Sequence, residues 1–445
     1  MPRRLWLIVI VLSLSALYGA QPPRACAPAP AAAHLRYANM PLDAVAFRHF
    51  AKPYHEWYLA PETLRLDQTP NGVTPASARA PQQVAIGLLG PIEHGAPGHG
   101  FGLQMLWGAQ MAVARANARG GFHRRPGDAG IPYALDLHND SALWGSSSNE
   151  IADMVFRQHV WAMLGSINAV STHVALRVAL KLGLPIVNTG TSDPTLTETR
   201  VPWLLRDFPD DRQQGYALAN AILHQRKLTR VAVLMSVSRY GRLGVSEFVN
   251  VARRVGAPPV AELEYDPAQA SPKRAARLAR IIAATHPQAI LLWGGPAGAA
   301  RQLRALRAAQ IQAPVFGGSR LCTQRFLQAA GPAANGMVVT CALDPTRTNP
   351  RWQAFRRSFE RRYHRLPDAY AARAYDGMNI LIGAIQRGGL SRSGIMRALM
   401  GYEMNGYCGV SGPSFFDHTL NDIAPVPLAR VENGHFIFEH RSARR

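Results

Sequence analysis

Residues 163–197 read MLGSINAVSTHVALRVALKLGLPIVNTGTSDPTLT. Together with the two residues before them, they predict a strand at Trp161–Leu164, a helix at Ser171–Leu182 that ends at Gly183, and a strand at Leu184–Asn188. Two short apolar strands separated by one helix form a parallel β-α-β unit, because parallel strands need a long crossover connection. The stretch therefore indicates an α/β protein.

The same alternation continues on both sides of this stretch. Towards the N-terminus, strands are predicted at Val84–Leu89 and Tyr133–Leu137, and helices at Gly102–Ala118 and Ser146–Gln158. Towards the C-terminus a second series follows, with helices at Arg212–Gln225, Gly244–Val255, Lys273–Thr285 and Ala299–Ala309, and strands at Val231–Met235, Val260–Leu263, Ala289–Trp293 and Val315–Gly317. Two such series predict two doubly wound lobes with parallel sheets, whose ligand-facing loops lie at the carboxyl ends of the strands.

The C-terminal part of the chain departs from this alternation. Longer helices are predicted at Pro350–Tyr363 and Ala369–Gln386, and a shorter one at Gly394–Met400. The last predicted element is a hairpin of Pro427–Val431 and His435–Phe438, because an Asn-Gly pair lies between these two segments.

The N-terminal residues are not expected to belong to either lobe. Arg3 and Arg4 precede an apolar run from Leu5 to Leu17, which is shorter than the about 20 residues that span a bilayer. We interpret residues 1–20 as an export signal peptide or, if they stay uncleaved, as an N-terminal membrane anchor. Residues 21–83 are interpreted as a Pro/Ala-rich tether and an N-terminal arm.

The composition indicates a globular protein with a basic surface. The chain has 445 residues, of which 47% are hydrophobic and 17% charged, and this is enough for two sizeable cores. The formal net charge of +21 fits either a solvated basic surface or nucleic-acid binding. We prefer the first interpretation, because pairs such as Arg253 with Arg254 and Arg361 with Arg362 are spread over several predicted helices. Export also argues against nucleic acid as a partner.

The four cysteines give no sign of a structural zinc site, since none of them forms a CxxC pair. Export to an oxidising compartment would permit one disulfide among Cys322, Cys341 and Cys408. The sequence does not decide which pair forms, and free buried thiols are the alternative.

Several segments follow one another in an order that is found in a known family. Besides the stretch quoted first, they are VAIGLLGPIEHG (84–95), GAQMAVARANARGG (108–121), LLRDFPDDRQQGYALA (204–219), RVAVLMSVSRYGRLGVSEF (230–248), YHRLPDAYAARAYDGMNILIGAI (363–385) and GVSGPSFFDH (409–418). Over residues 84–438 the chain thereby resembles the type I periplasmic binding proteins of the leucine/isoleucine/valine-binding kind.

The resemblance implies two doubly wound parallel-sheet lobes joined by a hinge that the chain crosses three times. Lobe 1 would be residues 84–208 plus 343–412, and lobe 2 residues 209–342 plus 413–438. The implied function is that of the periplasmic, exported solute-binding component of an ABC importer. Such a protein captures a small polar solute (an amino acid, an amide or an organic acid) by hinge closure and passes it to a permease in the inner membrane.

Two other functions stay open on the sequence. The first is a ligand-sensing or regulatory module of the same fold with a sensor protein as partner. The second, less favoured, is an enzyme on this scaffold, because a fold by itself does not exclude catalysis. The sequence contains no GxxxxGK[ST], HExxH or GxSxG motif, and we expect no catalytic residues and no cofactor.

The loop Gly165–Thr172 is the first predicted part of the ligand site. Ser171 and Thr172 are suitable caps for the following helix, whose free N–H groups and dipole favour a carboxylate. In the resembling family this loop binds a ligand carboxylate, and the family's serine falls at Ala169 here. The expected contacts are therefore those of Ser171 and of the backbone at Ala169 and Val170.

Four further residues are predicted to contact the ligand because they match family positions. Gly190 and Ser192 would hold it through a backbone carbonyl and a hydroxyl; a polar turn before Pro194 is the alternative, but the match favours the ligand role. Tyr240 would close over it from lobe 2. Phe101 would stack against its apolar part, with core packing as the rival role.

Ser319 is the most informative departure from the family. Its amino-acid binders have a carboxylate near this position, which pairs with the ammonium group of the ligand, and a buried ammonium without such a partner is costly. Here Ser319 and Arg320 stand instead. Either another acid such as Glu93 or Asp193 takes over, or the ligand has no ammonium group.

Four histidines of the sequence could in principle gather as metal ligands near the cleft, namely His94, His99, His138 and His173. No two of them have the spacing of ligands on one helix, so we interpret them as scattered histidines and expect no metal site.

Overall fold

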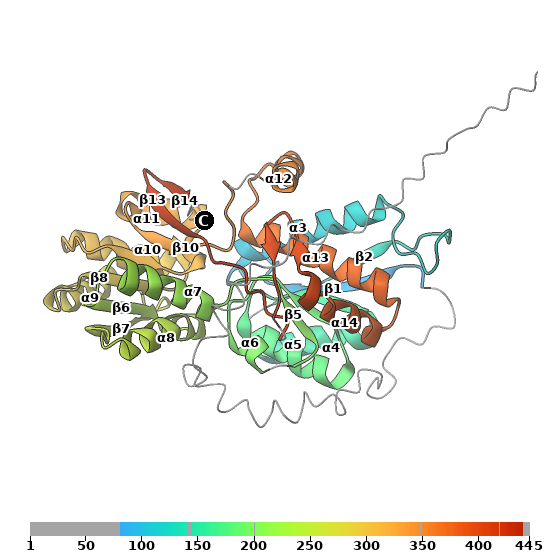
Figure 1. The fold of residues 1–445 in the computed structure, drawn as a ribbon, viewed down its shortest axis with the longest axis horizontal. Coiled ribbons are helices and arrows are strands. Elements are labelled where there is room, and N and C mark those ends of the chain that lie inside the picture. Colours follow the sequence, from blue (N-terminus) through green and yellow to red (C-terminus); the bar gives the residue numbers. More distant parts are fainter. Residues whose placement is uncertain (1–80, 141–143, 200, 347–348, 418, 439–445) are drawn as a thin grey trace, which may run out of the picture.

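The computed structural model describes residues 81–140, 144–199, 201–346, 349–417 and 419–438. The predicted signal peptide or anchor and almost all of the predicted tether and arm lie outside these residues. The described chain forms two large sheets, each covered by helices, that lie beside each other (Figure 1), and one short two-stranded ribbon. Both sheets are mostly parallel, so the predicted α/β fold is confirmed.

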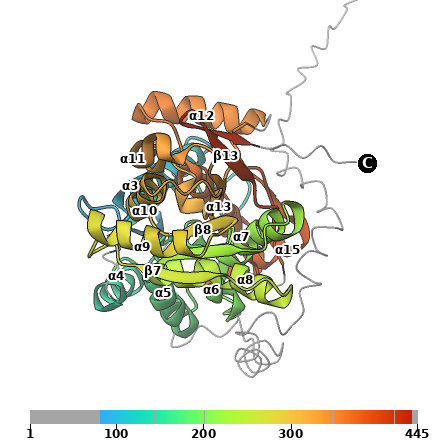
Figure 2. The same cartoon turned by 90° about the vertical axis from the view of Figure 1, so that its left-hand side faces the viewer.

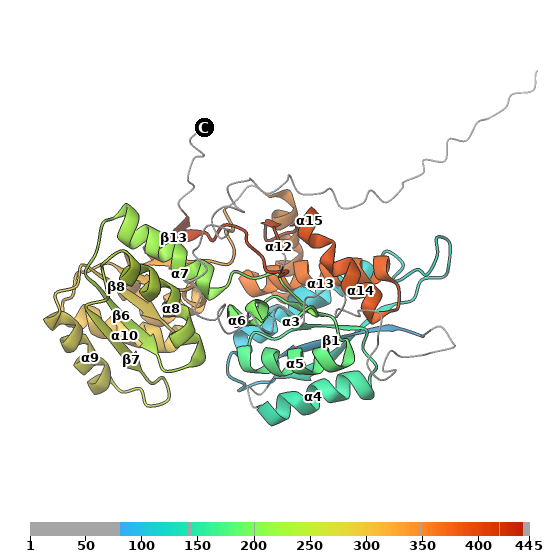
Figure 3. The same ribbon diagram turned by 60° about the horizontal axis from the view of Figure 1, so that its bottom comes forward.

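The first sheet has five parallel strands in the order β2-β1-β3-β4-β5. The strands are β1 (Val84–Gly90), β2 (Tyr133–Asn139), β3 (Ala162–Gly165), β4 (Ile186–Asn188) and β5 (Leu204–Arg206). Helices cover both faces: α3 and α13 lie on one side, and α4 and α5 on the other (Figure 3). We refer to this sheet and its helices as the five-stranded half.

The helices of the five-stranded half come from two separate parts of the chain. From the first part come α3 (His99–Asn117), α4 (Trp144–Phe156), α5 (Ala169–Leu182) and α6 (Thr195–Glu198). From the second come α12 (Pro350–Tyr363), α13 (Ala369–Gly388), α14 (Arg392–Met400) and α15 (Tyr402–Asn405), followed by the short ribbon of β11 (Tyr407–Cys408) and β12 (Pro413–Ser414). A Cβ at Gly108 of α3 would lie 2.1 Å from the carbonyl oxygen of Ala371 in α13, so glycine permits these two helices to pack closely.

The second sheet has seven strands in the order β14-β13-β10-β9-β8-β6-β7. The parallel strands are β6 (Val231–Ser236), β7 (Ala261–Tyr265), β8 (Ala289–Trp293), β9 (Val315–Gly317) and β10 (Val338–Thr340). The antiparallel hairpin of β13 (Leu428–Glu432) and β14 (His435–Phe438) completes one edge, at the place where a hairpin was predicted. We refer to this sheet and its helices as the seven-stranded half.

Two separate apolar clusters bury the faces of the second sheet. One lies under α7 (Asp211–Ala219), the π-helical turn Asn220–Gln225 and α8 (Arg239–Arg254). The other lies under α9 (Pro272–Ala284), α10 (Pro296–Ala308) and α11 (Gln324–Ala330). Figure 2 shows the strands of this half between these two groups of helices.

The chain passes between the two halves three times, after β5, after β10 and before β13. One side chain of α13 contacts all three connections. Arg373 is buried, and its Nη1 donates to Asp207 of the first connection at 2.7 Å and to Asp422 of the third at 2.9 Å. Its Nε donates to the carbonyl oxygen of Ala342 in the second at 3.1 Å. Arg373 therefore fixes the three connections relative to one another.

A disulfide joins Cys322 and Cys341, one of the pairs that the sequence left open. The bond connects the segment after β9 to the end of β10, across a sequence separation of 19 residues. Free thiols at these two positions, the alternative interpretation, are excluded.

Helix α8 begins at Arg239, five residues before its predicted start at Gly244. Ser238 caps it by accepting a hydrogen bond from the N–H of Gly241 at 3.2 Å. The predicted start was wrong because Gly241, in the part that was left out, has a low helix propensity. A Cβ at Gly244 would lie 1.9 Å from Nε1 of Trp293, so this glycine serves packing of the helix on β8.

The described surface is basic on several elements. Arg253 and Arg254 at the end of α8 are exposed, and so are the arginine pairs of α12. In the part of the chain that the structure describes, no helix combines the length and the apolar character that crossing a membrane requires.

Candidate functional site

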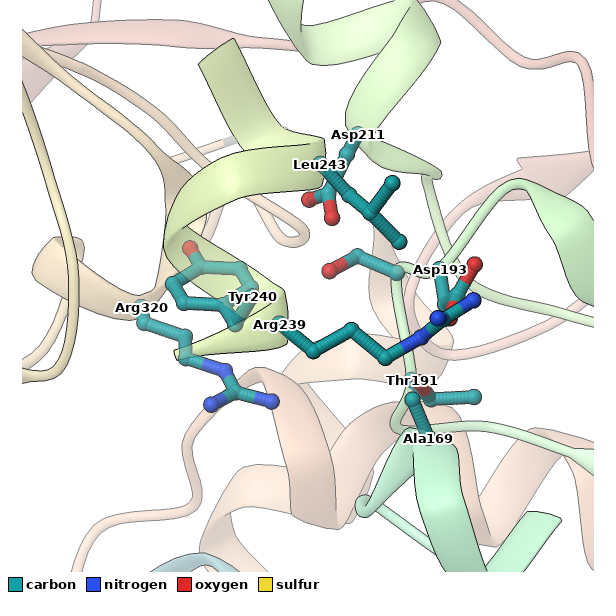
Figure 4. Close-up of a pocket in the computed structure, with 9 residues that line it drawn as sticks. Ala169, Thr191, Asp193, Asp211, Arg239, Tyr240, Leu243 and Arg320 are labelled. Atoms are coloured by element: carbon teal, nitrogen blue, oxygen red, sulfur yellow. The ribbon is translucent and has the colours of Figure 1, made fainter. Parts of the chain in front are cut away.

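A small cavity of about 10 Å³ lies where the two halves meet (Figure 4). The residues that line it come from the ends of β4, from α5, α7 and α8, and from the turn after β9; they are Ala169, Thr191, Ser192, Asp193, Asp211, Arg239, Tyr240, Leu243 and Arg320. Strand ends of both sheets thus supply the lining, as expected for an α/β protein with a ligand site.

Arg239 crosses from the seven-stranded half to the five-stranded half (Figure 4). Its Nε donates to Asp193 Oδ2 at 2.6 Å, and its Nη2 donates to the Thr195 hydroxyl at 3.0 Å. His173 also lies 3.4 Å from the same Asp193 oxygen. Burial alone would raise the pKa of Asp193, but hydrogen bonds from His173, Arg239 and Thr195 outweigh it and hold this pKa well below its usual value.

Asp211 is a second carboxyl group in the cavity lining, and it is 1% exposed. Its Oδ1 makes no hydrogen bond with any described residue. Burial raises the pKa of Asp211 well above its usual value, and the Ser192 hydroxyl and the charge of Arg320 lower it by less. A buried carboxyl group with an unused oxygen is costly unless it is neutral or gains a partner.

Arg320 and Tyr240 form the wall on the seven-stranded side. The guanidinium carbon of Arg320 lies 4.0 Å from the ring centroid of Tyr240, within the range of a cation–π contact. Its Nη2 reaches across to the carbonyl oxygen of Ile167 in the five-stranded half at 3.4 Å. The Tyr240 ring itself rests on Trp293, with 5.9 Å between the ring centroids.

Three of the eight predicted ligand contacts line this cavity: Ala169, Ser192 and Tyr240. Ala169 is the first residue of α5, and Ser192 lies in the turn after β4. Tyr240 lies in the first turn of α8 and faces the other two from the opposite half. The structure therefore brings these three positions together around one space.

The capping role expected of Ser171 and Thr172 is corrected by the structure. Asn168 is the cap of α5, because its Oδ1 accepts from the N–H of Val170 at 2.8 Å and of Ser171 at 3.4 Å. The Ser171 hydroxyl is buried and donates to Asp140. The N–H of Val170 is thus already used, and neither Val170 nor Ser171 lines the cavity.

The remaining predicted contacts, Phe101, Gly190 and Ser319, lie outside the cavity lining. Phe101 stacks on Tyr370 with 4.6 Å between ring centroids, which is the core-packing role. A Cβ at Gly190 would lie 2.4 Å from the side chain of Ile167, so this glycine permits close packing of two loops. The backbone N–H of Ser319 donates to Gln214 at 2.8 Å, and its hydroxyl makes no hydrogen bond with a described residue.

Sequence reasoning missed Asp211, Arg239, Thr191 and Leu243 as cavity residues. Asp211 and Arg239 stand inside segments that carried the family resemblance, but each is next to a more conspicuous neighbour, the capping Asp210 and the aromatic Tyr240. Of the two acids considered as substitutes for the absent one, Asp193 lines the cavity, whereas Glu93 accepts from Asn139 at 2.9 Å on the exposed surface.

The four histidines do not come together. His94 and His99 have ring centroids 5.7 Å apart, while His173 contacts Thr195 at 3.0 Å and His138 lies on β2. Within the described ranges, no group of three or more His, Cys, Asp or Glu side chains is arranged to hold a metal ion.

His138 instead lies between carboxylates, and this gives a pH prediction. Its ring nitrogens contact Glu150 at 2.5 Å and Asp136 at 2.8 Å, and Asp153 lies 4.0 Å away. Burial alone would lower the pKa of His138, but the hydrogen bonds and charges of Glu150 and Asp136 outweigh it and raise the pKa above its usual value.

A raised pKa means that the folded state binds the proton of His138 more tightly. The resulting stability is complete below the unfolded pKa of about 6.5 and is lost as the pH rises through the higher folded pKa. We expect His138→Gln to lower the melting temperature more at pH 6 than at pH 9, measured by thermal denaturation beside the unchanged protein. An equal decrease at both pH values would contradict the role of the proton.

A second cavity, of about 260 Å³, lies at the start of α12. Among its lining residues are Asn349, Trp352, Val410 and Pro413, all from the segments that pack on the five-stranded half. The cavity around Tyr240, by contrast, is lined by residues of both halves.

Comparisons with known proteins agree with this architecture. A family model described as periplasmic binding protein matches residues 83–435. The Leu/Ile/Val-binding protein homolog 3 of Brucella melitensis is 25% identical over 310 residues, which cover 69% of this chain and 79% of that protein.

Two solved structures share the fold. One is a branched-chain amino acid transporter substrate-binding protein of Streptococcus pneumoniae in complex with isoleucine, with a TM-score of 0.70, 21% identity, and coverage of 80% of this chain and 97% of that one. The other is an ABC transporter solute-binding protein of R. palustris in complex with benzoate, with a TM-score of 0.69, 18% identity, and coverage of 80% and 95%. At such identities the likeness shows the fold alone.

Proposed function

Because the chain belongs to the periplasmic binding protein family, we propose that it is the solute-binding component of an ABC importer. It captures a small polar solute in the cavity between its two halves and delivers it to a permease in the inner membrane. The observation that carries this proposal is the origin of the cavity lining, since Ala169 and Ser192 face Tyr240 and Arg320 from the opposite half.

The mechanism follows from contacts to both halves. A solute that touches both halves binds the closed arrangement more tightly than the open one. This difference in affinity determines how far the solute shifts the equilibrium towards the closed arrangement. We propose residues 84–208 plus 343–412 and 209–342 plus 413–438 as the two moving lobes, with the three connections around Arg373 as the hinge. The Arg239–Asp193 ion pair joins the two halves directly and so stabilises the closed arrangement without taking part in solute binding.

The proposed solute classes are an amino acid, an amide or an organic acid. Relatives of this fold include one solved with isoleucine and one solved with benzoate, so the fold accommodates both zwitterions and simple acids. A binding role without catalysis and export directed by residues 1–20 belong to the same proposal. The cavity measures about 10 Å³ in this arrangement, room for about one water molecule, so the two halves must move apart to admit such a solute.

The test begins with the solute that accompanies the purified protein. Denaturation should release a small molecule that mass spectrometry identifies, and the refolded protein should bind it with a raised melting temperature. Cells that lack the gene should then take up the labelled solute more slowly. Conversion of the solute by the protein, or undiminished uptake in those cells, would contradict the proposal.

A further inference from the structure

Of the two arginines that line the cavity, one is paired with a carboxylate and the other is not. Arg239 is neutralised by Asp193, which also accepts hydrogen bonds from Thr195 and lies close to His173. Asp193 therefore has no oxygen left for a positively charged solute. Among the described residues, no carboxylate forms an ion pair with Arg320, although this side chain lines the same cavity.

The aromatic face that could hold a ligand cation is already covered. The face of a tyrosine ring attracts a cation such as an ammonium group. In this chain the guanidinium group of Arg320 lies 4.0 Å from the Tyr240 centroid, which leaves that face to the protein's own cation (Figure 4). An ammonium group placed beside it would meet a like charge, and this repulsion is strong away from water.

Asp211, the remaining carboxyl group in the lining, does not offset the repulsion of an ammonium group by Arg320. Asp211 is buried, and its burial favours the neutral form, which accepts or donates hydrogen bonds without attracting a cation. The charged groups that face it are Asp193 and Asp210, which raise its pKa, and Arg320, which lowers it; the hydroxyl of Tyr240 is also close. A positive charge on the solute thus has no free ionised carboxylate to pair with in this lining.

Arg320 also has donors to spare. A guanidinium group carries five N–H donors in a planar fork that matches a carboxylate. One donor is used by the hydrogen bond to Ile167 at 3.4 Å and another by the hydroxyl of Tyr370, which leaves the others for a solute. Opposite Arg320 lies Ala169, the first residue of α5, where the positive end of the helix dipole adds to the attraction for an anion.

We propose that Arg320 takes the place of a ligand ammonium group at the Tyr240 ring and donates hydrogen bonds to the carboxylate of the solute, which is an organic acid without an ammonium group. This inference rests on the proposed function and names the solute class of the same cavity. Arg320 is then the residue that determines specificity, and it does so by attracting a carboxylate and repelling an ammonium group.

The experiment compares acids with and without an ammonium group. Titration calorimetry on the full chain uses two matched pairs, L-leucine with 4-methylpentanoate and L-phenylalanine with 3-phenylpropanoate, together with benzoate. The unchanged protein should bind at least one acid of the panel roughly tenfold or more tightly than its amino-acid counterpart, since an unpaired like charge costs more than about 1.4 kcal/mol.

Two substitutions of Arg320 test its two expected roles, attraction of a carboxylate and repulsion of an ammonium group. Arg320→Gln should weaken binding of that acid by roughly 10- to 100-fold, because a charge-assisted hydrogen bond is lost. Arg320→Ala should in addition free the Tyr240 face and raise the affinity for the matching amino acid. Arg277→Gln, an exposed arginine of α9 in the same half, is the matched control and should leave both affinities unchanged. Circular dichroism checks that each variant is folded.

The outcomes separate this inference from the proposed function. Tighter binding of the amino acids by the unchanged protein, unaltered affinity in Arg320→Gln, or no binding of any acid would each overturn the inference. In the first case Asp211 would be the ammonium partner, and the importer proposal would stand. Failure of every solute, including the one that copurifies, would count against the proposed function itself.

Discussion

Replacing Arg373 by methionine is expected to lower the free energy of unfolding by about 3–5 kcal/mol, because the substitution leaves buried carboxyl groups without their cation. Asp207 is fully buried and Asp422 is 1% exposed, and both accept from the same Nη1 of Arg373. Urea denaturation of the two proteins would measure the difference. Arg387→Met, in the same helix but exposed, is the control and should cost less than about 1 kcal/mol.

The loss should depend on pH in a defined direction. Burial raises the pKa of Asp422 to about 6 even though the Arg373 charge lowers it. Without that charge the carboxyl group is protonated more readily, and the protonated form does not need a cation. The destabilisation by Arg373→Met should therefore be smaller at pH 5 than at pH 8. A loss as small as that of Arg387→Met would show that the three connections are not held through Arg373.

Filling the cavity should abolish binding while the fold persists. Ala169→Trp places an indole into the space between the first turn of α5 and Tyr240, and we expect the affinity for the copurified solute to fall at least about 100-fold, or about 3 kcal/mol. Ala169 precedes the buried part of α5, so the melting temperature without solute should change little.

Val170→Trp is the matched control for this prediction. Val170 is the next residue of the same helix turn, is 36% exposed and does not line the cavity. The same large side chain should therefore leave solute affinity unchanged there. Equal losses in the two variants, or none in either, would place the solute elsewhere. An effect of Val170→Trp alone would support the original expectation that Val170 contacts the ligand.

The sequence was sufficient for most of the fold because buried parallel strands are short apolar runs between amphipathic helices. Strand β8 and helix α12 have the predicted bounds. The errors have local causes. Strand β5 was not predicted because three residues carry too little pattern, and α8 was predicted to begin too late because Gly241 in its first turn is an unfavourable helix residue.

The site was less predictable because its chemistry arises where the two halves meet. Tyr240 and Ser192 could be found from matching segments, and both line the cavity. Arg239 and Asp193 belong to different halves and are 46 positions apart in the sequence, so no local sequence pattern predicts their contact. The position of Arg320 over Tyr240 likewise becomes visible only in three dimensions. The cap of α5 was misassigned because several polar residues compete for that role and only the backbone geometry selects Asn168.

The most direct measurement is a crystal structure of the protein saturated with the solute that binds most tightly. The account predicts difference density for that solute between Ala169 and Tyr240, with contacts to residues of both halves. Density bound to one half alone, or in the cavity at the start of α12, would contradict it.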